Sequence, residues 1–133
     1  MATSTEFPSE FIAYTQKNSL VGIKAGRTRE TFLNIWIVEV DNRFFSRSWN
    51  KSDKSWFTEF LRTGVGQIRY GDSVIDVKGK QLPPGDKMQE KIDSAYRTKY
   101  NQPENIFYSE GISQPEYAHY TLEFFIDKTK PTT

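Results

Sequence analysis

Two pairs of β-rich segments, each joined by only two residues, constrain the fold of this chain more than any other feature. The first pair is NIWIVEV (34–40) and RFFSRSW (43–49), and the second is VGQIRY (65–70) and SVIDVKG (73–79). The connecting residues are Asp41 with Asn42 and Gly71 with Asp72, which are residue types that tolerate a positive φ. Such loops favour tight hairpins, so we expect the chain to build an antiparallel sheet.

The two-residue loops also fix which residues face each other across each hairpin. In the first hairpin the expected pairs are Val40 with Arg43, Val38 with Phe45, Trp36 with Arg47 and Asn34 with Trp49. In the second hairpin they are Tyr70 with Ser73, Ile68 with Ile75 and Gln67 with Asp76. The second hairpin then has one apolar and one polar face, which is typical of a sheet with one solvated side.

Helices are expected before and between the hairpins. A short one begins after Pro8 and ends near Asn18, and a strand follows at 19–26. Another is capped by Ser52 or Asp53 and stops at Gly64. The residues expected to form its buried stripe are Trp56, Phe57, Phe60 and Leu61.

A further helix and a last strand follow the second hairpin. Asp86 and Gln89 make a capping-box-like start for a helix that runs to about Tyr100. One side of this helix is expected to carry Met88, Ile92, Ala95 and Tyr96. Residues 101–116 are predicted to be irregular with a short strand at 105–109, and 117–127 to be the final strand. This order predicts a mainly β (α+β) fold, a small barrel with helices at its rim.

Composition excludes several kinds of site. The chain has no cysteine and one histidine, His119, so thiolate chemistry and Cys- or His-rich metal sites are excluded. The net charge of +1 lacks the basic excess typical of polyanion binders. MATSTEFPSEF does not resemble a signal peptide, and no apolar stretch approaches the roughly 18 residues of a membrane helix. We expect one soluble, cytoplasmic domain over 1–133, with its ordered core at about 9–127.

The strongest candidate site is the turn SWNKSDK, between the end of a strand and the start of a helix. A helix N-terminus exposes unpaired N–H groups that attract anions. Arg47, Ser48, Lys51 and Lys54 surround that turn and supply the donors that a phosphate monoester needs. The alternative is that Arg47 packs on the ring of Trp36 and that the lysines are solvated.

The other candidate residues are aromatic side chains and His119, and for two of them two interpretations are open. Trp49, at a strand end, stacks on a flat ligand or covers a barrel mouth, whereas Trp56 is expected in the core or an interface. Tyr96 is expected to be packed, and Tyr100 to lend a hydroxyl to a pocket or to pack as well. His119 is expected in mid-strand as a structural residue, because it has no partner at a catalytic spacing.

With these residues in view, the chain resembles a known family. GRTRETFLNIWIVEVDNRFFSRSWNKSDKSWFTEF, GQIRYGD and AYRTKY resemble a bacterial family of unknown function over residues 9–127. That family is similar to the FMN-binding split barrels, nearest the deazaflavin-dependent nitroreductase branch. The resemblance implies a six-stranded antiparallel split β-barrel, a homodimer, and FMN or a deazaflavin in a groove at the interface.

The resemblance also implies a set of cofactor-binding residues. Those matching the phosphate and ribityl region are Arg29, Thr31, Arg47, Ser48, Asn50, Lys51, Lys54 and Trp56. Trp36 or Trp49 would pack near the ring, with backbone groups at 34–36 facing it. The chain departs from that branch at WNKSDK (49–54), which has no glycine where the branch has a glycine-rich, lysine-bearing loop.

Two function classes follow, and a third is disfavoured. The first is a flavin- or deazaflavin-dependent oxidoreductase in which the cofactor carries the hydride chemistry and no side chain is catalytic. The second is a barrel without a redox cofactor that binds a phosphorylated small molecule or acts as a dimeric interaction module. Binding of single-stranded nucleic acid is disfavoured by the near-zero net charge.

Overall fold

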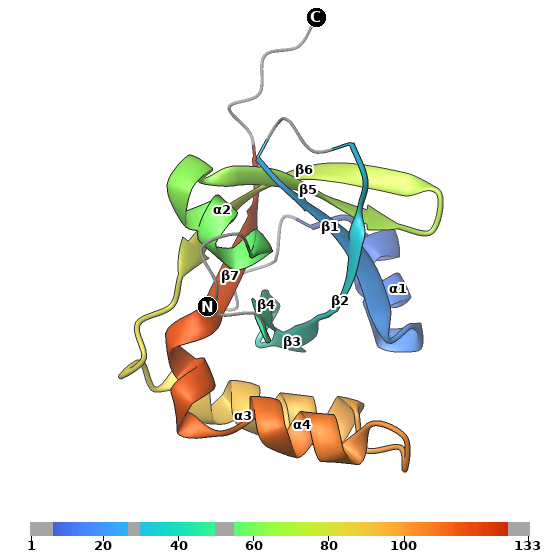
Figure 1. Cartoon of the computed structure of the whole chain (residues 1–133). Helices are drawn as coiled ribbons and strands as arrows, with labels where there is room; N and C mark the ends of the chain where they lie inside the picture. Colours follow the sequence, from blue (N-terminus) through green and yellow to red (C-terminus); the bar gives the residue numbers. More distant parts are fainter. Residues whose placement is uncertain (1–6, 27–29, 50–54, 128–133) are drawn as a thin grey trace, which may run out of the picture.

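A computed structural model of the chain describes residues 7–26, 30–49 and 55–127 (Figure 1). The strands are β1 (Leu20–Ala25), β2 (Leu33–Trp36), β3 (Val38–Val40), β4 (Arg43–Arg47), β5 (Val65–Tyr70), β6 (Ser73–Gln81) and β7 (Thr121–Ile126). The α-helices are α1 (Ser9–Lys17), α2 (Trp56–Thr63), α3 (Met88–Lys99) and α4 (Ile106–Ile112). A 3-10 helix, η1 (Pro115–Tyr120), leads into β7.

The strands form one antiparallel sheet that closes almost completely into a barrel. Its order is β2-β1-β5-β6-β7-β4-β3. The two edge strands, β2 and β3, are separated in the chain only by Ile37, so the edges of the sheet are joined through the backbone (Figure 1). This confirms the predicted antiparallel barrel with peripheral helices. The strand count is seven because the expected strand at 34–40 is divided at Ile37.

The hairpin loops behave as predicted. Asp41 and Asn42 have φ of 54° and 66°, which are the values of a tight hairpin turn. The pairs nearest this turn are those expected, Val40 with Arg43 and Val38 with Phe45. In the second hairpin all three expected pairs form, Tyr70 with Ser73, Ile68 with Ile75 and Gln67 with Asp76.

The first hairpin does not continue as predicted beyond Val38. The expected pairs of Trp36 with Arg47 and of Asn34 with Trp49 are wrong. Trp36 pairs instead with Leu20 of β1, and Arg47 pairs with Thr121 of β7. The two strands therefore separate, each to a different neighbour, and the sequence of the hairpin alone carries no signal for that change of partner.

The helix ends differ from expectation in two places. The N-cap of α2 is Ser55, whose Oγ accepts a hydrogen bond from the Thr58 N–H, whereas the expected caps at 52 and 53 lie outside the described residues. Leu61 is 46% exposed, so the buried stripe of α2 is narrower than predicted. Gly64 ends the helix with φ of 77°, as predicted from its freedom to adopt a left-handed conformation.

The largest error concerns residues 101–120. The expected irregular stretch contains α4, and the short strand predicted at 105–109 does not form. His119 is exposed in η1 rather than in mid-strand, because β7 begins only at Thr121. The amphipathic signal is weak here, since Phe107 is 76% exposed and Gly111 lies inside the helix.

Aromatic side chains fill two hydrophobic clusters. The barrel interior contains Phe11, Phe44, Phe60 and Phe124, all fully buried. A second cluster lies between the barrel and α3, where Phe45, Val38, Ile92, Tyr96 and Tyr100 meet. Figure 1 shows α3 and α4 side by side beneath β3 and β4, so this second cluster fixes the helices to the part of the barrel where β2 and β4 diverge.

Candidate functional site

The divergence of β2 and β4 is stabilised by hydroxyl groups that replace strand-to-strand hydrogen bonds. The Ile37 N–H donates to the Tyr100 phenol oxygen at 3.0 Å, and the Arg47 N–H donates to the Tyr96 phenol oxygen at 2.8 Å. Tyr96 lies in α3, and Tyr100 is the C-cap residue of the same helix, one turn further on. In a continuous hairpin the Arg47 N–H would donate across the ladder to Trp36, and here Tyr96 accepts that hydrogen bond instead.

A third hydroxyl acts at the same point. Ser46 Oγ donates to the Trp36 carbonyl oxygen at 2.7 Å. Burial raises the pKa of Tyr96 to about 12 and raises that of Tyr100 further, so both phenols remain protonated at neutral pH. Three side-chain hydroxyl groups thus form hydrogen bonds with the backbone at the opening between the strands.

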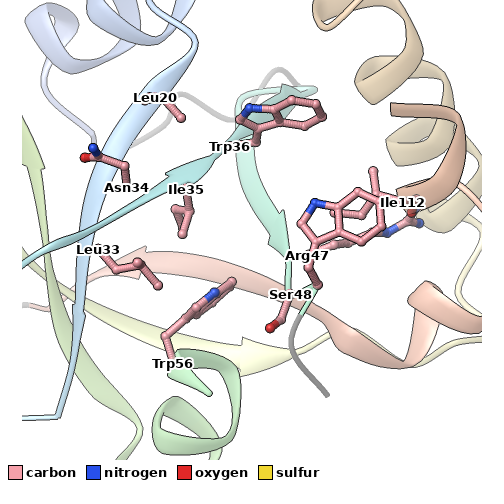
Figure 2. Close-up of a pocket in the computed structure, with 10 residues that line it drawn as sticks. Leu20, Leu33, Asn34, Ile35, Trp36, Arg47, Ser48, Trp56 and Ile112 are labelled. Atoms are coloured by element: carbon pink, nitrogen blue, oxygen red, sulfur yellow. The ribbon is translucent and has the colours of Figure 1, made fainter. Parts of the chain in front are cut away.

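A cleft of about 250 Å³ occupies this opening (Figure 2). Its walls come from the start of β1, from β2, from the end of β4, from the first residue of α2 and from the last residue of α4. The lining residues are Leu20, Leu33, Asn34, Ile35, Trp36, Arg47, Ser48, Trp49, Trp56 and Ile112. Figure 2 shows Trp36 at one end and Trp56 at the other, with the β2 residues between them.

The structure brings five of the ten expected cofactor-binding residues to this cleft. They are Trp36, Arg47, Ser48, Trp49 and Trp56. Thr31 is exposed and does not line it. Arg29, Asn50, Lys51 and Lys54 lie outside the described residues.

Arg47 lines the cleft, but its guanidinium is bound within the protein. The side chain is 1% exposed. Nε donates to Thr121 Oγ1 at 3.0 Å, and Nη1 donates to Asp93 Oδ1 at 2.5 Å and to the Ile112 carbonyl oxygen at 3.0 Å. Nη2 donates to Gln89 Oε1 at 2.8 Å and more weakly to the Gln89 carbonyl oxygen at 3.4 Å. All five N–H groups thus have protein acceptors.

This arrangement changes the role expected for Arg47. Its donors join α3, α4 and β7 and leave none directed at the cleft. The alternative contact with Trp36 does not form either, because the guanidinium lies 5.9 Å from the centre of the Tyr96 ring instead. Gln89 takes part in the same network, which explains why it does not complete the expected capping box: its Nε2 donates to the carbonyl oxygens of Pro83 and Ala118.

The three tryptophans have different environments. Trp36 stacks on Tyr100 with ring centres 3.9 Å apart and planes 6° apart, which fixes the orientation of its indole. Trp56 is 5% exposed and stacks on Phe124, so it belongs to the core as predicted and also forms one wall of the cleft. Trp49 is 44% exposed and makes an edge contact with Tyr117 at 5.1 Å.

Sequence reasoning missed five lining side chains and the helix that carries one of them. Leu20 and Leu33 are 41% and 44% exposed, and large apolar residues at exposed strand positions were the available signal. The side chains of Asn34 and Ile35 line the cleft, although only the backbone groups at 34–36 were expected to face a ligand. Ile112 comes from α4, which the sequence did not predict as a helix. Of the two alternatives expected for Tyr100, the structure shows packing, because its ring stacks on Trp36 and supports the cleft from behind.

The chemistry available in the cleft is that of binding. Its walls are mainly apolar and aromatic, with Asn34 and Ser48 as the polar side chains besides Arg47. Such surfaces suit a flat, largely apolar ring held by a few hydrogen bonds. Among the described residues, no group of three His, Cys, Asp or Glu could hold a metal ion.

Comparison with known families identifies the chain. Residues 12–124 match a family described as "Uncharacterized protein conserved in bacteria (DUF2255)". The chain belongs to this family. No curated protein matches the sequence of this DUF2255 member.

Solved structures with the same fold share little sequence with this DUF2255 chain. One is described as a "Putative Pyridoxamine 5'-phosphate oxidase" from Listeria innocua, with 11% identity, a TM-score of 0.56 and coverage of 91% of this chain and 92% of that one. Another is a FAD-binding protein from Mesorhizobium loti, with 11% identity, a TM-score of 0.58 and coverage of 92% and 91%. Both support the split-barrel fold predicted from the sequence. None of the helices in the described ranges is long and apolar enough to cross a membrane.

Proposed function

We propose that the cleft between β2 and β4 binds the ring system of a flavin or deazaflavin, and that the protein is an oxidoreductase related to the nitroreductase-like split barrels. The observation that carries this proposal is the cleft itself, which lies where the barrel opens and between two tryptophans, Trp36 and Trp56. The fold shared with a FAD-binding protein adds support.

In this proposal the described residues bind and orient the ring. Trp36, held flat against Tyr100, offers a fixed aromatic surface, and Leu33 and Ile35 add apolar contacts. Asn34 and Ser48 are the polar side chains positioned to select ring or ribityl oxygens. A bound flavin or deazaflavin would supply the hydride transfer, while the chain contributes binding, orientation and exclusion of water.

The phosphate is assigned to residues other than Arg47. Because the guanidinium of Arg47 is used within the protein, Lys51, Lys54 and Asn50 are the candidates, with Arg29 and Thr31 assisting. Lys51 and Lys54 lie in the chain between Trp49 and Trp56, which both line the cleft.

We also propose that a second copy of the chain completes the site. A cleft of about 250 Å³ is below the roughly 300–1,000 Å³ of typical small-molecule pockets. Leu20, Leu33 and Trp49 remain substantially exposed at its rim. A homodimer that covers this rim would bury these side chains and enlarge the pocket.

A ligand titration tests the proposal. FMN and a deazaflavin are titrated into the purified protein, with tryptophan fluorescence and thermal unfolding as readouts. Leu33→Lys places a charge at the cleft, whereas Val74→Lys makes the same change at a strand position that is equally exposed but away from the cleft. We expect Leu33→Lys to weaken binding at least about tenfold, equivalent to about 1.4 kcal/mol, and Val74→Lys to leave it unchanged. Absence of binding to the wild type would overturn the proposal.

One observation favours a second candidate, a barrel that binds a phosphorylated small molecule without turnover. Arg47 is the only ionisable side chain among the described cleft residues, and it is fully hydrogen-bonded to the protein. A site without an acid or base suits binding as well as cofactor-borne chemistry. The two candidates separate in an assay of the ligand-loaded protein with a nicotinamide or reduced deazaflavin donor, since only the oxidoreductase consumes the donor.

A further inference from the structure

Lys99, in the last turn of α3, is a half-buried amine attached to the point where the barrel opens. Its Nζ donates to the Ile37 carbonyl oxygen at 2.7 Å and lies 5.4 Å from the centre of the Tyr100 ring. Ile37 is the single residue between β2 and β3, and its N–H donates to Tyr100. Both backbone groups of the residue at the strand break are therefore held by the end of α3.

The charge environment of Lys99 is unlike that of an ordinary surface lysine. Within the described part of the chain it forms no ion pair, whereas the exposed Lys91 on the same helix pairs with Asp41 at 3.1 Å. Glu39 on β3 is the carboxylate that attracts it, and this attraction is smaller than the cost of burial. Burial consequently lowers the pKa of Lys99 to about 8, so about a tenth of the amine is neutral at pH 7.

Two recesses give access to this amine. One, of about 310 Å³, lies between the end of α1 and the residues that follow α3, and is lined by Gln16, Lys17, Asn18, Ser19, Lys99, Gln102, Glu104 and Asn105. The other, of about 220 Å³, is lined by Thr15, Gln16, Glu39 and Lys99. The side chain of Lys99 borders both, and amide and hydroxyl groups surround it. A small polar molecule can therefore reach Lys99 without passing through the cleft.

We propose that Lys99 is a site of covalent acylation by small acyl phosphates, and that its modification is transmitted through Ile37 to the cleft. The recesses supply the room for an acyl group, and the polar lining supplies hydrogen bonds for the phosphate. Lys17 in the larger recess adds a positive charge for the same phosphate, and the opposite charge of Glu104 lines the same recess. This inference does not depend on flavin binding.

The chemical step balances without any further reactant. The Lys99 ammonium first gives one proton to water. The lone pair of the neutral amine then attacks the acyl carbon, a C–N bond forms, and the C–O bond to phosphate breaks with its electron pair leaving on phosphate. The second proton on nitrogen passes to that phosphate, which departs as hydrogen phosphate. The product is a neutral amide at a position that is desolvated and lacks an ion-pair partner, where a neutral group is favoured.

The consequence for the cleft follows from the bond that is lost. The acyl group occupies the space next to Nζ and removes its charge, so the charge-assisted hydrogen bond to the Ile37 carbonyl oxygen is weakened or broken. Ile37 is then held by Tyr100 alone. Trp36, next to it, stacks on that same tyrosine, so the wall of the cleft is expected to become more mobile.

Labelling of the intact wild-type protein tests the first part. The protein is incubated with acetyl phosphate at neutral pH, and acetylation of each lysine is followed by peptide mass spectrometry. We expect Lys99 to be acetylated at least about fivefold faster than Lys91, although Lys91 is the more exposed of the two. Equal or slower labelling of Lys99 overturns the proposal, and neither outcome requires a functional flavin site.

Hydrogen exchange tests the second part. Acetyl-phosphate-treated wild type is compared with Lys99→Arg treated in the same way, which carries every acetyl group except the one at Lys99. Untreated Lys99→Arg, compared with untreated wild type, controls for the substitution itself. We expect faster amide exchange in the peptide covering 33–40 in the treated wild type only. Unchanged exchange in that peptide, with Lys99 shown to be acetylated, overturns the coupling to the cleft.

Discussion

The phenol oxygen of Tyr100 accepts a hydrogen bond from the Ile37 N–H at 3.0 Å, across 63 residues of chain. Tyr96 does the same for the Arg47 N–H at 2.8 Å. A continuous β2–β4 ladder would pair the Arg47 N–H with Trp36, so Tyr96 replaces a ladder hydrogen bond. Tyr100 satisfies the N–H of the residue at the strand break. Helix α3 thus maintains the split in the barrel, and the cleft exists because two tyrosine hydroxyls are available one helical turn apart.

Removing one hydroxyl tests this relationship. Tyr100→Phe keeps the ring that stacks on Trp36 but leaves the buried Ile37 N–H without its acceptor. We expect the free energy of unfolding to fall by about 1–3 kcal/mol, the usual cost of an unsatisfied buried donor. Urea denaturation measures it, and Tyr108→Phe, at a position 52% exposed, serves as the control with little expected effect. Equal stability of the two variants would contradict the role given to Tyr100.

Arg47→Lys distinguishes a structural arginine from a phosphate-binding one. Lysine keeps the charge but cannot reach Thr121, Asp93 and Gln89 together. We expect a loss of about 2–4 kcal/mol in the free energy of unfolding, because a buried ion pair is disrupted. The control is Arg43→Lys, whose partner is Glu123 and whose side chain is 40% exposed, with an expected loss within about 1 kcal/mol.

The opposite pattern in the same experiment would restore the phosphate role. If Arg47→Lys unfolded at the same urea concentration as the wild type but lost affinity for FMN, the guanidinium would have to leave its protein acceptors when the ligand binds. Measuring stability and affinity on one preparation separates the two roles.

Local sequence signals predicted the parts of the fold that depend on neighbouring residues. The turn at Asp41 and Asn42 and the helix stop at Gly64 each depend on a backbone conformation that few residue types adopt, so they could be predicted without knowledge of the rest of the chain. The two hairpins, which are defined by their two-residue turns, in turn predicted the barrel.

The candidate site depends on contacts that are distant in sequence, and prediction was less complete there. Arg47 and Trp36, both expected to bind a cofactor, line the cleft, but the acceptors of Arg47 come from α3, α4 and β7. The predicted pairing of Trp36 with Arg47 was wrong because the Arg47 N–H donates to the Tyr96 phenol oxygen instead. Tyr96 lies 49 residues beyond Arg47 in the chain. Nothing in a hairpin sequence reveals a competing donor or acceptor that another element provides.

Two glycines make a matched pair for testing how tightly the barrel is packed. A Cβ added at Gly79 in β6 would lie 2.6 Å from both Phe60 and Leu122, which are fully buried. At Gly85, nothing lies within 4 Å of the same added atom. We expect Gly79→Ala to lower the free energy of unfolding by about 1–3 kcal/mol through overpacking, and Gly85→Ala to leave it unchanged or raise it slightly.

Thermal or urea unfolding of both glycine variants checks this. Far-UV circular dichroism of Gly79→Ala confirms that the barrel still forms, so that a lower midpoint reports packing. A Gly79→Ala protein as stable as Gly85→Ala would mean that Phe60 and Leu122 can move apart at little cost, which the dense aromatic core argues against.

The pH dependence of stability provides a test of the environment of Lys99. Its pKa is lowered to about 8, while an unfolded lysine has a pKa near 10.4. Between these values the unfolded chain binds more protons than the folded one, so this lysine makes the free energy of unfolding rise with pH. Glu39 partly offsets the lowering of the Lys99 pKa, and Lys17 and Glu104 line a recess together with Lys99. Burial raises the pKa of Tyr100, so that phenol stays protonated in this pH window.

Lys99→Met removes the titrating group and keeps an apolar stem of similar length. We expect wild type to gain stability relative to Lys99→Met as the pH is raised from about 8 to about 9, below the pKa of about 10 of unfolded tyrosines. Lys91→Met, at an exposed ion pair, should follow the wild-type profile. Urea denaturation across this range measures all three proteins. Parallel profiles for wild type and Lys99→Met would mean that the folded and unfolded pKa values of Lys99 coincide, and that burial does not set the protonation of this amine.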